Sequence, residues 1–226
     1  MGGQACVFYG AAEFSRDTDL AILSTPERLE RFRAALADLE AECIALPPFE
    51  ADYLLRGHAL RFRCHHPDAA GMRIDVMSIM RGVAPFDLLW ARRTTIQTTD
   101  GDEYDLLSLA DLVQAKKTQR DKDWPMLRRL LEADYLQNRS HPTPEQLAFW
   151  LRELRTPVLL VELAVRYADQ AMAAARGRPL LALAATENPT GVENALAAEE
   201  AGEREADRMY WQPLRAELEA LRHRHP

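Results

Sequence analysis

The sequence predicts an α/β (α+β) fold in which a small mixed sheet flanked by helices is followed by an all-helical C-terminal region. Short runs of strand-like residues occur up to about residue 106, interrupted by a helical pattern. From residue 108 onward, apolar residues recur at helical spacing. Two prolines and a polar cluster, "RSHPTPEQ" at residues 139–146, mark a boundary. We therefore expect two domains, residues 1–138 and residues 139–226.

The composition is that of a globular protein. The chain has 226 residues, of which 47% are hydrophobic and 28% charged, with a formal net charge of -7. This acidic balance argues against broad non-specific nucleic-acid binding but leaves a local basic groove open. The sequence shows no signal peptide, no apolar run long enough to cross a membrane and no paired cysteine motif. We expect a cytoplasmic protein with no membrane partner.

The first part of the chain predicts strands around one long helix. Residues 18–23 are a short apolar run, typical of a buried strand. The stretch "STPE" at residues 24–27 predicts a helix start, because a hydroxyl side chain precedes proline, and apolar residues continue at helical spacing to about residue 40. Further strands are predicted at residues 43–46, 58–66 and 72–78, the last two alternating apolar and polar side chains.

The remainder predicts a hairpin and then helices alone. Asp100-Gly101 lies between two strand-like runs within residues 94–108, which is a strong local hairpin pattern. The helices are expected from residue 108, at residues 123–136, 144–155 and 157–176, and in a final charged helix near the C-terminus.

Three acidic side chains are the candidate metal ligands and catalytic groups. Asp17 and Asp19 lie one residue apart where a strand begins, so both project to the same side of it. Like charges held this close repel and are costly to bury unpaired, so a cation is expected between them. Asp75 supplies a third carboxylate if the two strands are neighbours, and a set of oxygen ligands favours Mg²⁺ or Mn²⁺. The alternative is a solvated strand end with Asp75 as an unrelated surface charge.

Several motifs in order along the chain resemble one enzyme superfamily. Gly2-Gly3 precedes Asp17-x-Asp19 in "GGQACVFYGAAEFSRDTDL", and Asp75 follows in "RIDVMS". Lys116 then ends "LADLVQAK", just before "RDKDW". This order resembles the nucleotidyltransferase superfamily with the DNA polymerase β-like fold, over about residues 1–136. It is most similar to stand-alone bacterial nucleotidyltransferases of the AbiEii type, found in abortive-infection and type IV toxin–antitoxin systems.

The resemblance implies a metal-dependent enzyme that moves a nucleoside monophosphate from a nucleoside triphosphate (NTP) to an acceptor hydroxyl. Residues 1–138 would be the nucleotidyltransferase domain, with its small mixed sheet. Asp17 and Asp19 would hold two Mg²⁺ or Mn²⁺ ions, while Asp75 would help to bind the second and accept a proton. The acceptor could be RNA, a protein or a small molecule, and an antitoxin partner is expected if the chain is a toxin. The alternative is a non-catalytic nucleotide-binding or partner-binding module of the same fold.

A further set of residues is expected to bind the nucleotide. Its members are Gly2, Gly3, Ser15, Arg16, Lys116, Arg120 and Asp123. The glycines would let the backbone approach a triphosphate closely, because no Cβ intervenes. Lys116 shares a helical face with Leu109 and Leu112, and a lysine that points inward needs an anion. The alternative for Lys116 is a position at the rim of the core with its amine in water.

Two further features lead to expectations about the chain end and the surface. In the superfamily a strand precedes the Gly-Gly pair, so we expect the natural chain to begin upstream of Met1; the alternative is that this sheet has lost an edge strand. A run of basic residues from Lys116 to Arg129 is the one plausible nucleic-acid patch in the sequence, although a solvated helix face accounts for it better.

Overall fold

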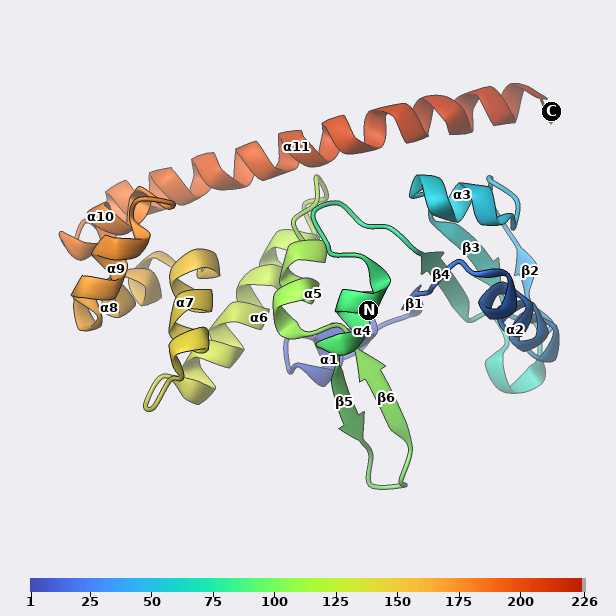
Figure 1. Ribbon diagram of the computed structural model, residues 1–226, viewed down its shortest axis with the longest axis horizontal. Helices are drawn as coiled ribbons and strands as arrows, with labels where there is room; N and C mark the ends of the chain where they lie inside the picture. The colour runs from blue at the N-terminus through green and yellow to red at the C-terminus, as the bar shows by residue number, and fades with distance from the viewer. Residues whose placement is uncertain (225–226) are drawn as a thin grey trace. The chain divides into compact units, whose positions relative to one another are not determined.

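The computed structural model describes residues 1–224 (Figure 1). The chain forms two compact units, one made of residues 1–115 with the segment that begins at Arg208, the other of Lys116–Asp207. The long helix α11 (Pro189–Arg224) contributes to both units. The predicted class, a mixture of a small sheet and many helices, is confirmed.

The first unit contains the strands and the shorter helices between them. Its elements are α1 (Gly2–Phe8), β1 (Asp17–Ala21), α2 (Pro26–Asp38), β2 (Glu42–Cys43), α3 (Ala51–Arg56), β3 (Leu60–Arg63), β4 (Arg73–Met77), α4 (Phe86–Ala91), β5 (Thr94–Gln97), β6 (Glu103–Leu106) and α5 (Leu109–Ala115). The predicted strands, the helix after residue 25 and the hairpin are therefore present, whereas α1, α3 and α4 were not predicted. These three helices have only six or seven residues each, too few for a helical period to stand out.

Four strands form a mixed sheet in the order β1-β4-β3-β2 (Figure 1). Strand β4 pairs with β1 in parallel and with β3 antiparallel, and β2 pairs with β3 antiparallel. Strands β5 and β6 form the separate hairpin, whose turn contains Gly101 at φ +90°. That left-handed conformation suits glycine, which explains why Asp-Gly marks the turn.

One face of the mixed sheet carries the apolar core of the first unit. Phe62 on β3 and Ile74 on β4 are buried there, and α2 covers them with Leu29 and Leu36 at helical spacing. The Phe62 ring also meets the Phe32 ring edge-on, with 5.8 Å between ring centroids. Because side chains alternate along a strand, the residues between these apolar positions face the opposite side of the sheet.

The second unit is helical. It contains α6 (Asp123–Asn138), α7 (Pro144–Glu153), α8 (Pro157–Arg166), α9 (Ala168–Ala174), α10 (Leu180–Ala185) and the first part of α11. The stretch expected to be helical at residues 157–176 is helical but divided into α8 and α9, because the chain leaves helical geometry at Tyr167, with φ -125° and ψ 55°. The break allows α9 to pack against α7, a tertiary contact that local spacing does not encode.

The predicted boundary between residues 138 and 139 falls inside this second unit. Trp150 on α7 packs edge-on against Tyr135 on α6, with 5.0 Å between ring centroids, and donates a hydrogen bond of 2.6 Å from Nε1 to Asp134 Oδ2. Helices on the two sides of the boundary therefore share one core. A compact unit and a domain need not coincide, so the domain ranges stay a prediction.

The Phe62→Ala variant should destabilise the first unit by about 3–5 kcal/mol, because it leaves a cavity among aromatic rings in the core. Urea denaturation followed by circular dichroism measures the loss. Phe14→Ala is the matched control, since the Phe14 side chain is 69% exposed, and it should change stability by less than about 0.5 kcal/mol. Equal effects of the two substitutions would contradict the described core.

Candidate functional site

The three predicted carboxylates lie on one face of the mixed sheet, opposite the apolar core. Asp19 on β1 and Asp75 on β4 are register partners, and Asp17 is the partner of Arg73. The condition under which Asp75 joins the other two acids, that the two strands are neighbours, is thereby met. The side chains of Asp17 and Asp75 are 32% and 30% exposed, so both acids are partly shielded and still open to solvent.

The electrostatics of this face are dominated by crowded carboxylates and by arginines next to them. Burial raises the pKa of Asp75, the nearby Asp19 and Asp17 raise it further, and Arg61 at 3.8 Å opposes these effects. Arg73 donates from Nε to Asp17 Oδ1 at 2.8 Å and from a second guanidinium nitrogen to the same oxygen. A carboxylate with a raised pKa holds a proton more readily than an ordinary aspartate.

The two glycines at the start of the chain pack directly against Asp19. An ideal Cβ on Gly2 would lie 1.8 Å from Asp19 Oδ2, and one on Gly3 would lie 2.4 Å from Ser15 Oγ. The Gly3 amide donates to Asp19 Oδ2 at 3.2 Å, and the terminal amine of Met1 donates to the Asp19 carbonyl at 2.7 Å. Gly2 has φ +68° and is the first residue of α1. Only glycine fits here, for reasons of space and of backbone angle.

Ser15 and Arg16, predicted beside the carboxylates, are held differently. Ser15 Oγ donates to the backbone carbonyl of Asp17 at 2.9 Å, which fixes the loop before β1. Arg16 is exposed, and its guanidinium carbon lies 5.9 Å from the centre of the Phe14 ring. Ser15 therefore belongs to the cluster around Asp17 and Gly3, whereas the Arg16 side chain contacts an exposed aromatic ring instead.

The fit of a divalent cation depends on the donor set. Within residues 1–224, no three His, Cys, Asp or Glu side chains are placed so that they could hold a metal ion. The donors nevertheless have the chemistry that Mg²⁺ or Mn²⁺ prefers, since all three are carboxylates on one face. To bind the ion, Asp17 would have to give up its ion pair with Arg73. The donor set fits a divalent ion by its chemistry, and the metal site stays a prediction.

The other three predicted nucleotide-binding residues form a cluster in the second unit. Asp123 is buried and accepts hydrogen bonds from Lys116 Nζ at 3.3 Å, Thr118 Oγ1 at 2.6 Å and Arg120 Nε at 2.7 Å. Lys116, just beyond the end of α5, has a side chain only 12% exposed. The anion that an inward lysine needs is therefore supplied by Asp123. Whether these residues contact a nucleotide stays a prediction.

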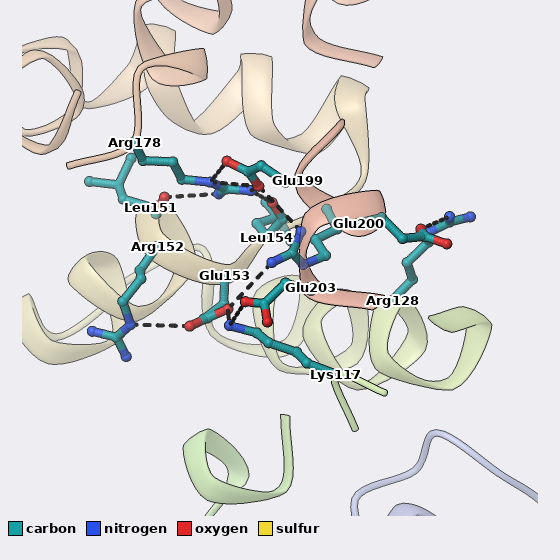
Figure 2. A network of polar contacts seen from close by, with 11 residues as sticks. Lys117, Arg128, Leu151, Arg152, Glu153, Leu154, Arg178, Glu199, Glu200 and Glu203 are labelled. Atoms are coloured by element: carbon teal, nitrogen blue, oxygen red, sulfur yellow. Dashed lines mark hydrogen bonds and ion pairs between the residues drawn. The ribbon is translucent and has the colours of Figure 1, made fainter. Parts of the chain in front are cut away.

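The second unit also contains a buried network of charged side chains that sequence reasoning missed (Figure 2). Lys117 Nζ lies 2.8 Å from Glu153 Oε2, and Arg178 donates to Glu199 at 2.9 Å and to the Leu151 carbonyl at 3.0 Å. Because Lys117 is only 7% exposed, the basic run of the sequence is not a continuous surface patch. The spacing of these residues along the chain does not predict ion pairs between helices that are far apart in the sequence.

A cavity of about 520 Å³ lies in the same unit. Its lining includes three arginines and three glutamates, namely Arg128, Arg155, Arg204, Glu132, Glu193 and Glu200. Arg128 and Arg204 both pair with Glu200, at 3.1 Å and 2.7 Å. The lining is therefore balanced in charge and gives no preference for an anion or a cation.

The sequence predicts no functional role for three arginines on the face of the sheet that carries the acids. They are Arg61 and Arg63 on β3 and Arg73 on β4. The alternating pattern "LRFR" already places Arg61 and Arg63 on the side opposite Phe62. That signal was present, but their nearness to the acids depends on strand order, which the sequence does not reveal.

Compared with protein-family models, with curated proteins and with solved structures, the chain gives no match. Among the described helices, none combines the length and the apolar character that crossing a bilayer requires.

The Asp123→Asn variant should destabilise the second unit by about 3 kcal/mol at pH 7, because it removes the buried charge that pairs with Lys116 and Arg120. Burial by itself would raise the pKa of Asp123, but Lys116, Thr118 and Arg120 outweigh it and lower the pKa. The stabilisation is therefore present above the unfolded pKa of about 3.9 and is lost as the pH falls through the lower folded value.

Thermal unfolding between pH 7 and pH 3 tests this dependence. The difference between wild type and Asp123→Asn should shrink as the pH falls below about 3.9. Asp121→Asn is the control, because the Asp121 side chain is 97% exposed and its ion pair with Arg204 lies at the surface. A difference that stays constant with pH would contradict the ionised state of Asp123.

Proposed function

We propose that this chain is a metal-dependent nucleotidyltransferase that moves a nucleoside monophosphate from an NTP to an acceptor hydroxyl. One observation carries the proposal. Asp19 and Asp75 come from separate segments of the chain and are register partners, with Asp17 on the same face. The order of motifs, which resembles the nucleotidyltransferase superfamily and its AbiEii type, supports it from the sequence.

In this proposal the three carboxylates bind Mg²⁺ or Mn²⁺ and handle the proton. A divalent ion held there would neutralise charge on the phosphates and favour departure of pyrophosphate. Asp75 is the general base that takes the proton of the acceptor hydroxyl, the role that the resemblance gives it, and its place beside Asp19 in the sheet is compatible with that role. Asp17 and Asp19 would hold the divalent ions that bind the triphosphate.

Gly2, Gly3 and Ser15 would form the contact surface for the triphosphate. The absence of a Cβ lets Gly2 pack against the Asp19 carboxylate and Gly3 against Ser15 Oγ, so the backbone of both glycines lies beside the proposed metal ligands. Their contact with the triphosphate is taken from the resemblance. An incoming phosphate would also attract Arg73, which frees Asp17 from its ion pair. Nucleotide and metal ion would then bind cooperatively. Arg16, Lys116, Arg120 and Asp123 enter the proposal through the resemblance alone, as does a toxin role with an antitoxin partner.

A non-catalytic nucleotide-binding or partner-binding module is the second candidate, and one observation favours it. Asp17 already pairs with Arg73, and Asp75 lies 3.8 Å from Arg61. Carboxylates neutralised in this way need no metal ion. A module of this kind would bind nucleotide and transfer nothing.

Incubation of the purified chain with labelled NTPs, Mg²⁺ and cell extract separates the two candidates. The enzyme should label RNA, protein or a small molecule, and Asp17→Asn, Asp19→Asn or Asp75→Asn should each reduce labelling at least about 100-fold. The exposed Asp38, at the end of α2, gives the control Asp38→Asn, which should keep wild-type activity. Nucleotide binding without any transfer would favour the module.

The thermal stability of Asp75→Asn gives a second, independent readout of the site. Asp75→Asn should raise the thermal midpoint of the metal-free chain by about 2 °C, because it removes repulsion from Asp19 and Asp17. Added Mg²⁺ should stabilise the wild type and not the variant. A loss of stability in Asp75→Asn would contradict the crowding of charge on this face.

Gly2→Ala should reduce transfer about 100-fold, because its Cβ would overlap Asp19 Oδ2 and push that carboxylate from its position. Gly10→Ala is a matched control. Gly10 has a similar φ of +74°, but no atom lies within 4 Å of the Cβ that would be added. Steady-state rates of the two variants separate backbone strain from displacement of Asp19, and equal losses would contradict the proposed contact.

A further inference from the structure

The acidic face of the sheet continues into a row of arginines. Arg61 on β3 is the register partner of Asp75, and Arg63 is the partner of Arg73 on β4. All three arginines share the solvent face with Asp19, because directly paired residues point to the same side of a sheet. With strands about 4.8 Å apart, Arg61 lies two strand spacings, or about 10 Å, from Asp19.

The positive charge on β3 is only partly compensated. Arg73 is committed to Asp17, and Arg61 reaches Asp75 only at 3.8 Å with a side chain 59% exposed. Within residues 1–224 the Arg63 side chain makes no hydrogen bond, ion pair or ring contact. Its other register partner, Glu42, lies 3.0 Å from His65 instead.

The pairing of Arg63 with Arg73 places two like charges directly opposite each other. Such a pair destabilises a sheet unless its charges are neutralised, and here Asp17 neutralises Arg73 but no described side chain neutralises Arg63. Guanidinium groups bind phosphate through two parallel hydrogen bonds, so an arginine row on an exposed surface suits a chain of phosphates. The side of the acids nearer to β1 already holds Gly2, Gly3 and Ser15, which the donor triphosphate would use.

We propose that Arg61 and Arg63 bind the phosphodiester backbone of the acceptor, so that the acceptor is the end of a single-stranded nucleic acid. This inference rests on the proposed function, because it assigns the substrate of the same site. The terminal hydroxyl of the strand lies at Asp19 and Asp75, and the preceding phosphates cross β4 to β3. Cationic small molecules are disfavoured as acceptors by the same arginines.

Fluorescence anisotropy of a labelled short oligonucleotide tests the inference without relying on transfer. Single-stranded RNA and single-stranded DNA of one sequence are the two probes, titrated with the full chain at about 50 and about 200 mM salt. The double variant Arg61→Gln/Arg63→Gln should bind the preferred probe about tenfold more weakly at the lower salt. The slope of log affinity against log salt should fall by about two.

The matched control is Arg28→Gln/Arg31→Gln, which removes the same charge from exposed positions of α2, the helix that covers the opposite face of the sheet. It should change affinity less than twofold. An equal loss of affinity in both double variants would show that the effect comes from net charge alone, and it would overturn the inference. The single variant Arg63→Gln, which breaks no described side-chain contact, serves if the double variant unfolds.

Steady-state kinetics separate this inference from the proposed function. If transfer occurs, Arg61→Gln/Arg63→Gln should raise the KM for the oligonucleotide and leave the KM for the NTP unchanged. A raised KM for the NTP instead would overturn the inference, as would labelling of a protein or a small molecule in preference to the oligonucleotide. Either result would leave the proposed transferase activity standing. Oligonucleotide binding through these arginines with no transfer from any NTP would overturn the proposed function alone.

Discussion

The parallel pairing of β1 with β4 is the constraint on which the candidate site depends. It places Asp19 beside Asp75 on one face, while the alternating residues Leu20 and Val76 face the apolar core. A slip of one residue in either strand would exchange the two faces and bury a carboxylate in place of an apolar side chain. The core beneath the sheet therefore sets the register that brings the acids together.

The two units differ in how far their charged side chains are paired. In the second unit, Lys117 and Arg178 each have a carboxylate partner, and Asp123 binds three donors. On the sheet face, burial and like charges raise the pKa of Asp75, and Arg63 stays without a described side-chain partner. Charges that are balanced internally serve stability, whereas the raised pKa of Asp75 and the exposed Arg63 agree with the proposed binding of an ion and of an anionic substrate.

The sequence predicts those features that depend on local periodicity. Alternation predicted β3 and β4, helical spacing predicted α2, and Asp-Gly predicted the hairpin turn. The common face of Asp17 and Asp19 follows from strand geometry alone, and Asp75 needed only the further assumption that the strands are neighbours. The short helices α3 and α4 and the break at Tyr167 have no such signal, because tertiary packing decides them.

The parts of the site that were missed depend on contacts between distant segments. The arginine row beside the acids requires the strand order β1-β4-β3, which no local pattern contains, and the contact of Gly2 with Asp19 requires α1 to pack against β1. The same holds for the pairs of Lys117 with Glu153 and of Arg178 with Glu199 in the second unit. The spacing of residues along the chain predicts which face of a helix or strand a side chain occupies. Which side chains from other elements lie beside it on that face depends on the topology of the fold.

The most direct test of the central claim is a titration of the isotope-labelled chain with Mn²⁺, followed by nuclear magnetic resonance. Paramagnetic broadening falls off steeply with distance and therefore locates the ion without any assumption about catalysis. The account predicts that the amide signals of Gly3, Asp19 and Asp75 broaden first and together, and that excess Mg²⁺ restores them. Broadening centred on another part of the chain, or none at all, would contradict the claim that Asp17, Asp19 and Asp75 form one metal site.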